Sequence, residues 1–439
     1  MLIIAALVIA GTIYLMVRRV DVRLVLLASG LVLALLAGAP LVIADTFTRG
    51  MVTSMVAPIC AAMGFAALMH ATGCDRHLVH LLLAPVKQLP WLVTPAGILT
   101  AYLVNMAVPS QTSTAAALGP ILVPLLLAAG HTPVVAGAAL LLGASFGGDL
   151  LNPGAQDIQA VAGVANLSAA ALSTRIIPAS LAGIAVATLV FSLLNRPGRP
   201  AVAAGKSGTG WPLVPAPLEA GEFRLNPIKA LIPLVPIVLL LAGYAGWKPL
   251  GWLIRTPDGP EWAALANALP VVRAMLIGGL IAVAVSWREI TALTRSFFDG
   301  MGNAYAGIIS LTITAQCFGA GLAAIGLAEA LLRLATETRM LEPLAAGFPW
   351  ALSVLSGSGS GPVLAFAQTF MTEMDGAHDS TRLGALACFG GAFGRTMSPV
   401  AAVTVYTSGL VGVAPVPLVG KVLPALASGA IVALVVAAR

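Results

Sequence analysis

Charged residues are scarce in this sequence, and their scarcity excludes a water-soluble protein of this size. Asp, Glu, Lys and Arg make up 9% of the 439 residues, whereas a soluble domain carries about 25%. Hydrophobic residues account for 59% of the chain, and the mean hydropathy is +0.97. Since so few charges cannot coat the surface of a soluble protein, lipid must solvate much of the chain. We therefore expect a multi-pass membrane protein without a sizeable soluble module.

The motifs of enzymes and ATP-driven pumps are missing as well. The chain has no GxxxxGK[ST] loop, no HExxH motif and no Ser/His/Asp constellation. Its four cysteines lack the spacing of metal ligands. The net charge of +6 does not indicate nucleic-acid binding, because the Lys and Arg residues sit in short loops between apolar segments. We expect no enzyme activity, cofactor or metal, and partners limited to the lipid bilayer and a small solute.

Apolar stretches near the length of about 20 residues that crosses a bilayer recur along the whole chain. They predict an all-α fold. In the first half we expect spans at about 2–16, 22–43, 51–71, 134–165 and 172–195. In the second half we expect them at about 227–247, 268–286, 301–330, 382–412 and 416–438.

The two halves carry the same polar pattern, which indicates a duplication. The hydroxyl residues of PSQTST (109–114) align with those of LSGSGS (355–360), and one constant offset relates them. The same offset relates Pro153 to Pro399, which end a Phe-Gly…Asn-Pro segment at 146–153 and a Phe-Gly…Ser-Pro segment at 393–399, and the Phe-Gly pairs differ from this offset by one residue. We therefore divide the chain into a first repeat at 1–195, a connector at 196–226 and a second repeat at 227–439.

The position of the polar interruptions sets the expected topology. Residues 90–130 read as a helix, a polar break and a second helix, which predicts a re-entrant hairpin, and 341–378 is its counterpart. Five true crossings per repeat would invert the second copy relative to the first. The excess of Lys and Arg in the loops then predicts periplasmic termini and a cytoplasmic connector in the cell inner membrane. The charged segment 72–88 is too short to span and predicts an interfacial arm.

Backbone broken by Gly, Pro and polar residues is tolerated at membrane depth only where it lines a protein cavity. Paired breaks in two repeats are typical of a secondary carrier with a binding site near the midplane. Helix N-termini and small hydroxyl residues suit anions, so we predict substrate contacts at both hairpin tips. These candidates are Ser110, Gln111, Thr112, Ser113, Thr114, Ser356, Gly357, Ser358, Gly359 and Ser360.

The second pair of breaks, at 146–153 and 393–399, supplies the remaining candidates. Asn152 and Ser398 precede prolines, which predicts N-caps of the following half-helices, and Thr396 lies beside them. Arg395 offers a planar fork that matches a carboxylate. Asp149 and Asp157 are the acidic residues at the same depth, where ionisable groups are usually functional. Each is a candidate to bind a coupling cation, carry a proton or neutralise Arg395, and the alternative is a structural Asp–Arg pair.

Several segments carry a resemblance to a known family. MGFAALMHATGCDRHLVHLL (63–82), NMAVPSQTSTAAALGPILVPL (105–125), SGSGSGPVLAFAQTF (356–370) and FGRTMSPVAAV (393–403) resemble the DcuC-type anaerobic carriers of four-carbon dicarboxylates. The resemblance implies inverted repeats, each with a re-entrant hairpin and one broken helix, and a homodimer. It implies a substrate such as succinate, fumarate or malate. It places Arg395, Ser398 and Asp157 on matching positions, whereas Asp149 is additional to the pattern.

The coupling ion stays open between H⁺ and Na⁺, and exchange is a further possibility. The hairpin tips read Ser-Gln-Thr and Ser-Gly-Ser, and neither is the Ser-Asn-Thr of related sodium symporters. We expect a secondary active transporter of dicarboxylates. The alternatives are a carrier of the same fold for another organic anion, such as a short-chain acid or an amino acid, an intramembrane enzyme, or a channel.

Overall fold

The structure, a computed structural model, is helical throughout the residues that it describes. These residues are 2–18, 20–53, 56–83, 90–165, 167–196, 224–259, 262, 265, 268–326, 340–371 and 379–439. Within them, six helices are long and apolar enough to cross a membrane, and a seventh span forms if a bent pair is counted as one. The expected all-α, multi-pass fold is confirmed. The connector at 196–226 falls almost entirely outside the described residues.

The first half of the chain contains ten α-helices and one short 3₁₀ helix within the described residues. They are α1 (Leu2–Val17), α2 (Val22–Leu36), α3 (Leu41–Gly50), α4 (Val56–Thr72), α5 (Cys74–Leu83), α6 (Pro90–Ala107), α7 (Gln111–Ala128), α8 (Pro133–Ser145), η1 (Asp149–Leu151), α9 (Gln156–Ala165) and α10 (Ala169–Leu194).

The second half begins with shorter helices and ends with a hairpin and a broken helix. Its described elements are α11 (Pro227–Leu231), η2 (Ile232–Leu234), α12 (Val235–Tyr244), η3 (Lys248–Leu250), α13 (Gly251–Ile254), α15 (Ala268–Val285), η4 (Trp287–Glu289), α16 (Ile290–Ala304), η5 (Tyr305–Ile309), α17 (Ser310–Ala324), α19 (Leu341–Ser356), α20 (Ser360–Phe366), η6 (Ala367–Met371), α21 (Ser380–Met397), α22 (Ala402–Val411) and α23 (Pro415–Ala437).

The single span expected at 22–43 is wrong, because the chain turns in its middle. Helix α2 ends at Leu36, and Gly38 follows in the left-handed conformation with φ +73°. A glycine in this position is a common helix stop, since it accepts positive φ without a steric penalty. Pro40 then precedes α3. Apolar character continues through this turn, so hydropathy alone did not reveal it.

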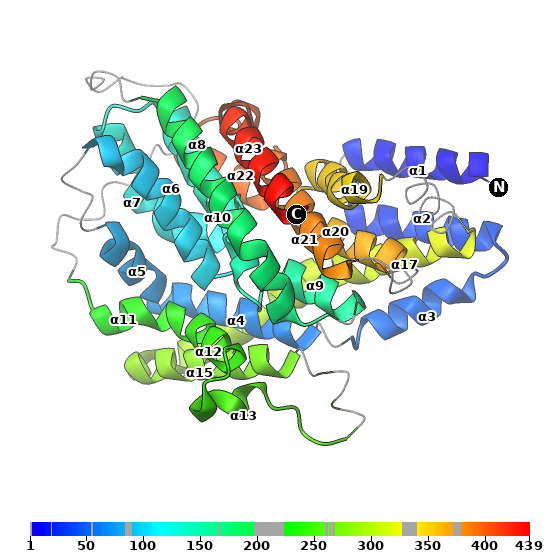
Figure 1. Cartoon of the computed structure of the whole chain (residues 1–439), viewed down its shortest axis with the longest axis horizontal. Helices are drawn as coiled ribbons and strands as arrows, with labels where there is room; N and C mark the ends of the chain where they lie inside the picture. Colours follow the sequence, from blue (N-terminus) through cyan, green and yellow to red (C-terminus); the bar gives the residue numbers. More distant parts are fainter. Residues whose placement is uncertain are drawn as a thin grey trace.

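The predicted helix–break–helix patterns occur at both hairpins. Helices α6 and α7 are separated by residues 108–110, and α19 and α20 by residues 357–359. Helices α6 and α7 pack against α8, while α19 and α20 pack against α21. Helices α8 and α21 touch each other, and α23 packs against α8, α10 and α21. Figure 1 shows α6, α7 and α8 on one side, α2, α3 and α17 on the other, and α21 and α23 between them.

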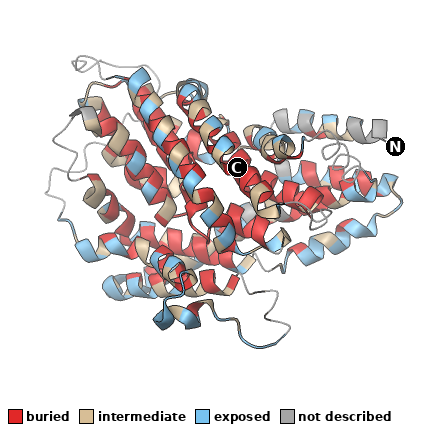
Figure 2. Ribbon diagram, in the orientation of Figure 1, coloured by how far each residue is buried: buried red, intermediate tan, exposed pale blue. Residues whose placement is uncertain are grey.

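The two broken helices form the centre of the molecule. Every residue of α8 from Val135 to Ser145 and every residue of α21 from Leu383 to Thr396 is buried. In Figure 2 the buried residues gather in the interior, where the helices meet. A helix that is buried on all sides packs against protein rather than lipid. The backbone breaks that follow α8 and α21 are therefore shielded from the bilayer.

Glycines allow each hairpin to pack tightly against its broken helix. A Cβ atom at Gly143 would lie 2.4 Å from the Ile98 carbonyl oxygen of α6, and one at Gly148 would lie 2.3 Å from that of Tyr102. The second half repeats this arrangement. There, a Cβ atom at Gly390 would lie 2.1 Å from the Ala346 carbonyl oxygen of α19. No side chain fits at such distances, so glycine sets the spacing of these helices.

We expect Gly390→Ala to destabilise the protein by about 1–3 kcal/mol, because the added methyl group would force α19 away from α21. The thermal midpoint of the purified protein in detergent measures this effect. Gly409→Ala in α22 is the matched control, because a Cβ atom there meets nothing within 4 Å. Equal midpoints for the two variants would contradict the close packing of α19 on α21.

Candidate functional site

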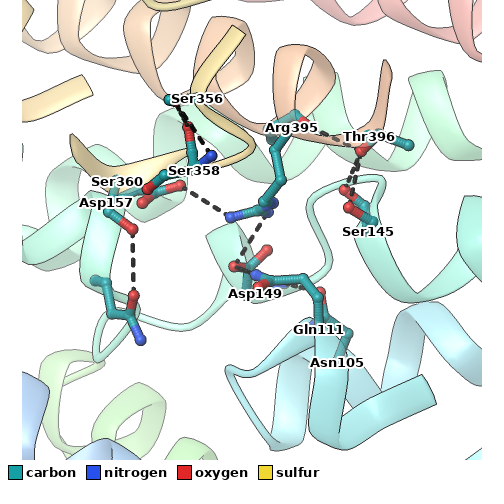
Figure 3. A network of polar contacts seen from close by, with 12 residues as sticks. Asn105, Gln111, Ser145, Asp149, Asp157, Ser356, Ser358, Ser360, Arg395 and Thr396 are labelled. Atoms are coloured by element: carbon teal, nitrogen blue, oxygen red, sulfur yellow. Dashed lines mark hydrogen bonds and ion pairs between the residues drawn. The ribbon is translucent and has the colours of Figure 1, made fainter. Parts of the chain in front are cut away.

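Three charged side chains meet at the centre of the fold, where the two broken helices approach each other (Figure 3). Arg395 lies in the last turn of α21, Asp149 in η1 and Asp157 in the first turn of α9. The Nη2 atom of Arg395 is 3.5 Å from Asp149 Oδ2, and its Nη1 atom is 3.7 Å from Asp157 Oδ2. The three side chains are 7%, 6% and 2% exposed, respectively. We call them the charge triad.

The charge triad holds more hydrogen-bonding capacity than it uses. Five of its polar atoms are buried and have no hydrogen-bond partner among the described residues: Nε and Nη2 of Arg395, Oδ1 of Asp149, and both carboxylate oxygens of Asp157. Buried polar atoms are normally paired, and exceptions often mark functional sites. The pair distances of 3.5 and 3.7 Å exceed those of charge-assisted hydrogen bonds, which are about 2.7–2.9 Å. The guanidinium can therefore bind a further acceptor.

The first hairpin tip reaches the triad through Gln111. Ser110 caps α7 by accepting the backbone N–H of Ser113 at 3.3 Å, and the hydroxyl of Ser110 donates to that of Ser113. This cap fixes Gln111 as the first residue of the helix. Its side-chain amide donates a short hydrogen bond to Oδ2 of Asp149. Thr112 is half-buried, and Thr114 is fully buried with an unpaired hydroxyl.

The second hairpin tip reaches the triad through its backbone. Gly357, with φ +73°, ends α19, and the backbone N–H of Ser358 donates to the Ser356 hydroxyl at 3.3 Å. A Cβ atom at Gly359 would lie 2.8 Å from Nη1 of Arg395, so a residue with a side chain would collide with the guanidinium. The hydroxyl of Ser360 donates to Gln156 Oε1 at 3.2 Å. Two tips that are distant in sequence thus meet at one charge cluster.

The first hairpin also holds the backbone of the first break. The side-chain oxygen of Asn105 accepts the backbone N–H of Asp149 at 2.9 Å, and the side-chain amide of Asn152 donates to the Met106 carbonyl at 3.0 Å. Asn105 was not among the residues predicted from the sequence, although an asparagine inside an apolar helix is itself a signal of function or structure at membrane depth. Asp149 is therefore fixed by α6 as well as by the tip.

The predicted N-caps at Asn152 and Ser398 are wrong. Asn152 accepts the N–H of Gly154 at 2.9 Å in a turn, and α9 begins only at Gln156. Ser398 ends α21, and the next helix begins at Ala402 with no side-chain cap. In each break the proline is followed by a turn rather than by a helix, so the polar residue stabilises the turn.

Thr396 connects the two broken helices. Its hydroxyl lies 2.7 Å from the Ser145 carbonyl of α8, 2.9 Å from the Ser145 hydroxyl and 2.7 Å from the Ala392 carbonyl. Thr396 is fully buried, and its hydroxyl is committed to this bridge. The structure thus gives Thr396 a packing contact between the two halves, and its assignment to substrate binding stays a prediction.

A site enclosed by hairpins and broken helices in a multi-pass fold is typical of a membrane transport protein. The family described as the C4-dicarboxylate anaerobic carrier, DcuC, matches residues 45–438. The chain belongs to this family. Since its members are carriers, the protein is a transporter and not an intramembrane enzyme, and the expected resemblance is confirmed.

Individual relatives agree with this assignment. The probable anaerobic C4-dicarboxylate transporter DcuC of Vibrio cholerae is 24% identical over 375 residues, which cover 82% of this chain and 76% of the relative. DcuC of Escherichia coli is 24% identical over 382 residues, covering 84% and 76%. An uncharacterized putative transporter of Haemophilus influenzae is 33% identical over 205 residues, covering 46% and 69%.

A solved structure supports the fold. The YdaH transporter of Alcanivorax borkumensis superimposes with a TM-score of 0.58 at 17% sequence identity, covering 90% of this chain and 86% of that one. At this identity the likeness concerns the fold alone.

We expect Thr396→Val to lower stability by about 1–3 kcal/mol, because the loss of the hydroxyl removes the Ser145 bridge. The half-saturating substrate concentration for transport should stay unchanged, since the side chain does not face the guanidinium. Thermal unfolding in detergent and uptake kinetics on the same preparation measure the two quantities. A raised half-saturating concentration at unchanged stability would instead assign Thr396 to the substrate.

Proposed function

We propose that the protein is a secondary carrier that moves four-carbon dicarboxylates, such as succinate, fumarate or malate, across the cytoplasmic membrane. The observation that carries this proposal is Arg395, a buried guanidinium with unpaired N–H groups at the meeting point of both hairpins. The relatives named as C4-dicarboxylate transporters support the same substrate class.

Arginine suits the first carboxylate of such a substrate. A carboxylate that enters a buried site loses most of its hydration, and a planar fork of N–H donors compensates better than a lysine ammonium. The second carboxylate would bind at the N-terminus of α7, where unpaired backbone amides carry partial positive charge. Asp149 and Asp157 would neutralise Arg395 while no substrate is bound, since a buried charge without a partner is costly.

Transport requires that the site open to each side of the membrane in turn. The hairpins, the broken helices, α10 and α23 share one hydrophobic core, whereas α4, α12 and α15 share another. Two smaller cores join α20 and α9 to α2, α3, α4 and α17. These smaller cores would be the contact along which the hairpin body is displaced against the remaining spans, by an elevator-like or rocking movement. Exchange of two anions, or coupling to H⁺ or Na⁺, would drive it. The same proposal includes that the two halves of the chain are inverted repeats and that the carrier is a homodimer.

The proposed topology places both termini in the periplasm and predicts the accessibility of single cysteines. Lys248→Cys should react with a membrane-impermeant maleimide added to intact cells, whereas Arg288→Cys should react only after the membrane is opened. Both positions are exposed, and the four native cysteines are buried. The opposite pattern of labelling would reverse the topology.

We expect Arg395→Lys and Arg395→Ala to abolish dicarboxylate uptake into proteoliposomes, by at least a hundredfold, because no other group replaces the bidentate contact. Uptake of radiolabelled substrate under imposed pH or sodium gradients measures this loss. Size-exclusion profiles in detergent show whether each variant stays folded. Arg295→Ala is the matched control, since that arginine is 86% exposed on α16.

A purely structural Arg–Asp pair makes a different prediction. In that case Arg395→Ala would misassemble because Asp149 and Asp157 lose their partner, and a second change of Asp149→Ala or Asp157→Ala would restore uptake. Recovered uptake in either double variant would therefore refute the binding role of Arg395.

A further inference from the structure

The charge triad is not electrically balanced. Two carboxylates, Asp149 and Asp157, face one guanidinium, and all three side chains are at most 7% exposed. Among the described residues, no other basic side chain forms an ion pair with either carboxylate. With all three groups ionised, the site carries one excess negative charge before any substrate binds.

Hydrogen bonds fix the position of Asp149, but they use only one of its two carboxylate oxygens. Its Oδ2 atom accepts from the Gln111 amide and lies 3.5 Å from Arg395, and its backbone N–H is bonded to Asn105. Its Oδ1 atom is buried and accepts no hydrogen bond from a described residue. On the other side of the guanidinium, neither oxygen of Asp157 accepts a hydrogen bond of good geometry within the described part of the chain, although the Ser360 hydroxyl lies near this carboxylate. The site thus offers unused acceptors beside unused donors.

This arrangement constrains the charge of the substrate. A dianion would bring the buried site to three excess negative charges, which is costly in a low-dielectric interior. A four-carbon dicarboxylate that carries an α-ammonium group brings only one net negative charge. Its ammonium has three N–H donors and no acceptor, and it sits on the carbon next to a carboxylate. A neighbouring guanidinium and carboxylate complement such a pair.

We propose that the preferred substrate is an amino-dicarboxylate, with its α-carboxylate on Arg395 and its ammonium on Asp149 and Asp157. This inference rests on the proposed function and names the substrate within that class. Asp149 is then a specificity-determining residue, which selects for the ammonium by its charge.

The comparison of L-aspartate with L-malate tests the proposal, because the two differ only by an ammonium in place of a hydroxyl. Competition against radiolabelled L-aspartate uptake in proteoliposomes at neutral pH gives the half-inhibiting concentration of each compound. We expect unlabelled L-aspartate to compete at a concentration at least tenfold lower than L-malate. This measurement uses the unaltered protein and does not depend on the folding of a variant.

Asp149→Asn removes the negative charge while it keeps the size and an acceptor for Gln111. We expect the preference for L-aspartate over L-malate to fall at least tenfold in this variant, and Asp157→Asn to act in the same direction. Asp299→Asn is the matched control, since that carboxylate is 68% exposed and pairs with Arg295 on the same helix. The control should keep the preference of the unaltered protein.

Three outcomes distinguish the possible failures. Equal competition by both compounds, or stronger competition by L-malate, would overturn the ammonium site while the carrier function stands. A preference for L-aspartate that Asp149→Asn and Asp157→Asn leave unchanged would overturn the role of these carboxylates. If neither L-aspartate, L-malate nor succinate is taken up under any imposed gradient, the proposed function itself fails.

Discussion

The burial of the Arg395 guanidinium between two carboxylates is the interaction on which the centre of this protein depends. Removing an ion from water costs several kcal/mol even after relaxation, and a buried pair regains this only with good geometry and further hydrogen bonds. Here the geometry is loose, with nitrogen–oxygen distances of 3.5 and 3.7 Å, and several polar atoms are unpaired. Such a geometry gives little stabilisation as a bridge, which supports the binding role that we propose for Arg395.

The surrounding structure is what makes such a site possible in a membrane. Irregular backbone at the two breaks would be unstable against lipid, so α8 and α21 are buried on all sides and each hairpin covers one of them. Glycines at positions 143, 148 and 390 bring the hairpin helices into backbone contact with the broken helices. Gly359 brings the second hairpin tip close to the site itself, because a Cβ atom there would come within 2.8 Å of Nη1 of Arg395 and push the guanidinium aside.

Much of this organisation could be predicted from the sequence, because it follows from composition and local chemistry. Polar and charged residues inside apolar segments identified both breaks, both tips and the charge triad, since each would be costly in lipid without a purpose. Local patterns could not give the turn after each proline, so the N-caps at Asn152 and Ser398 were wrong. The contact of Thr396 with Ser145 also depends on the packing of two distant helices, which no single segment encodes.

Asp149 departs from the family pattern, and the effect of this departure can be understood only from the structure. It was visible as an addition to the family pattern, but its effect depends on where its oxygens lie relative to Arg395 and Gln111. Because this geometry shows which ionisable groups share the site, the charges of the site can be added up. The same count links substrate charge to the two carboxylates, and a coupling H⁺ or Na⁺ bound at either carboxylate would lower the excess negative charge by one.

The most direct test of the central claim is an electron cryomicroscopy structure of the protein in lipid nanodiscs with a saturating dicarboxylate. The account predicts density for a carboxylate at hydrogen-bond distance from the Arg395 guanidinium, between the two hairpin tips. Substrate density elsewhere in the protein, with Arg395 still held between Asp149 and Asp157, would contradict it.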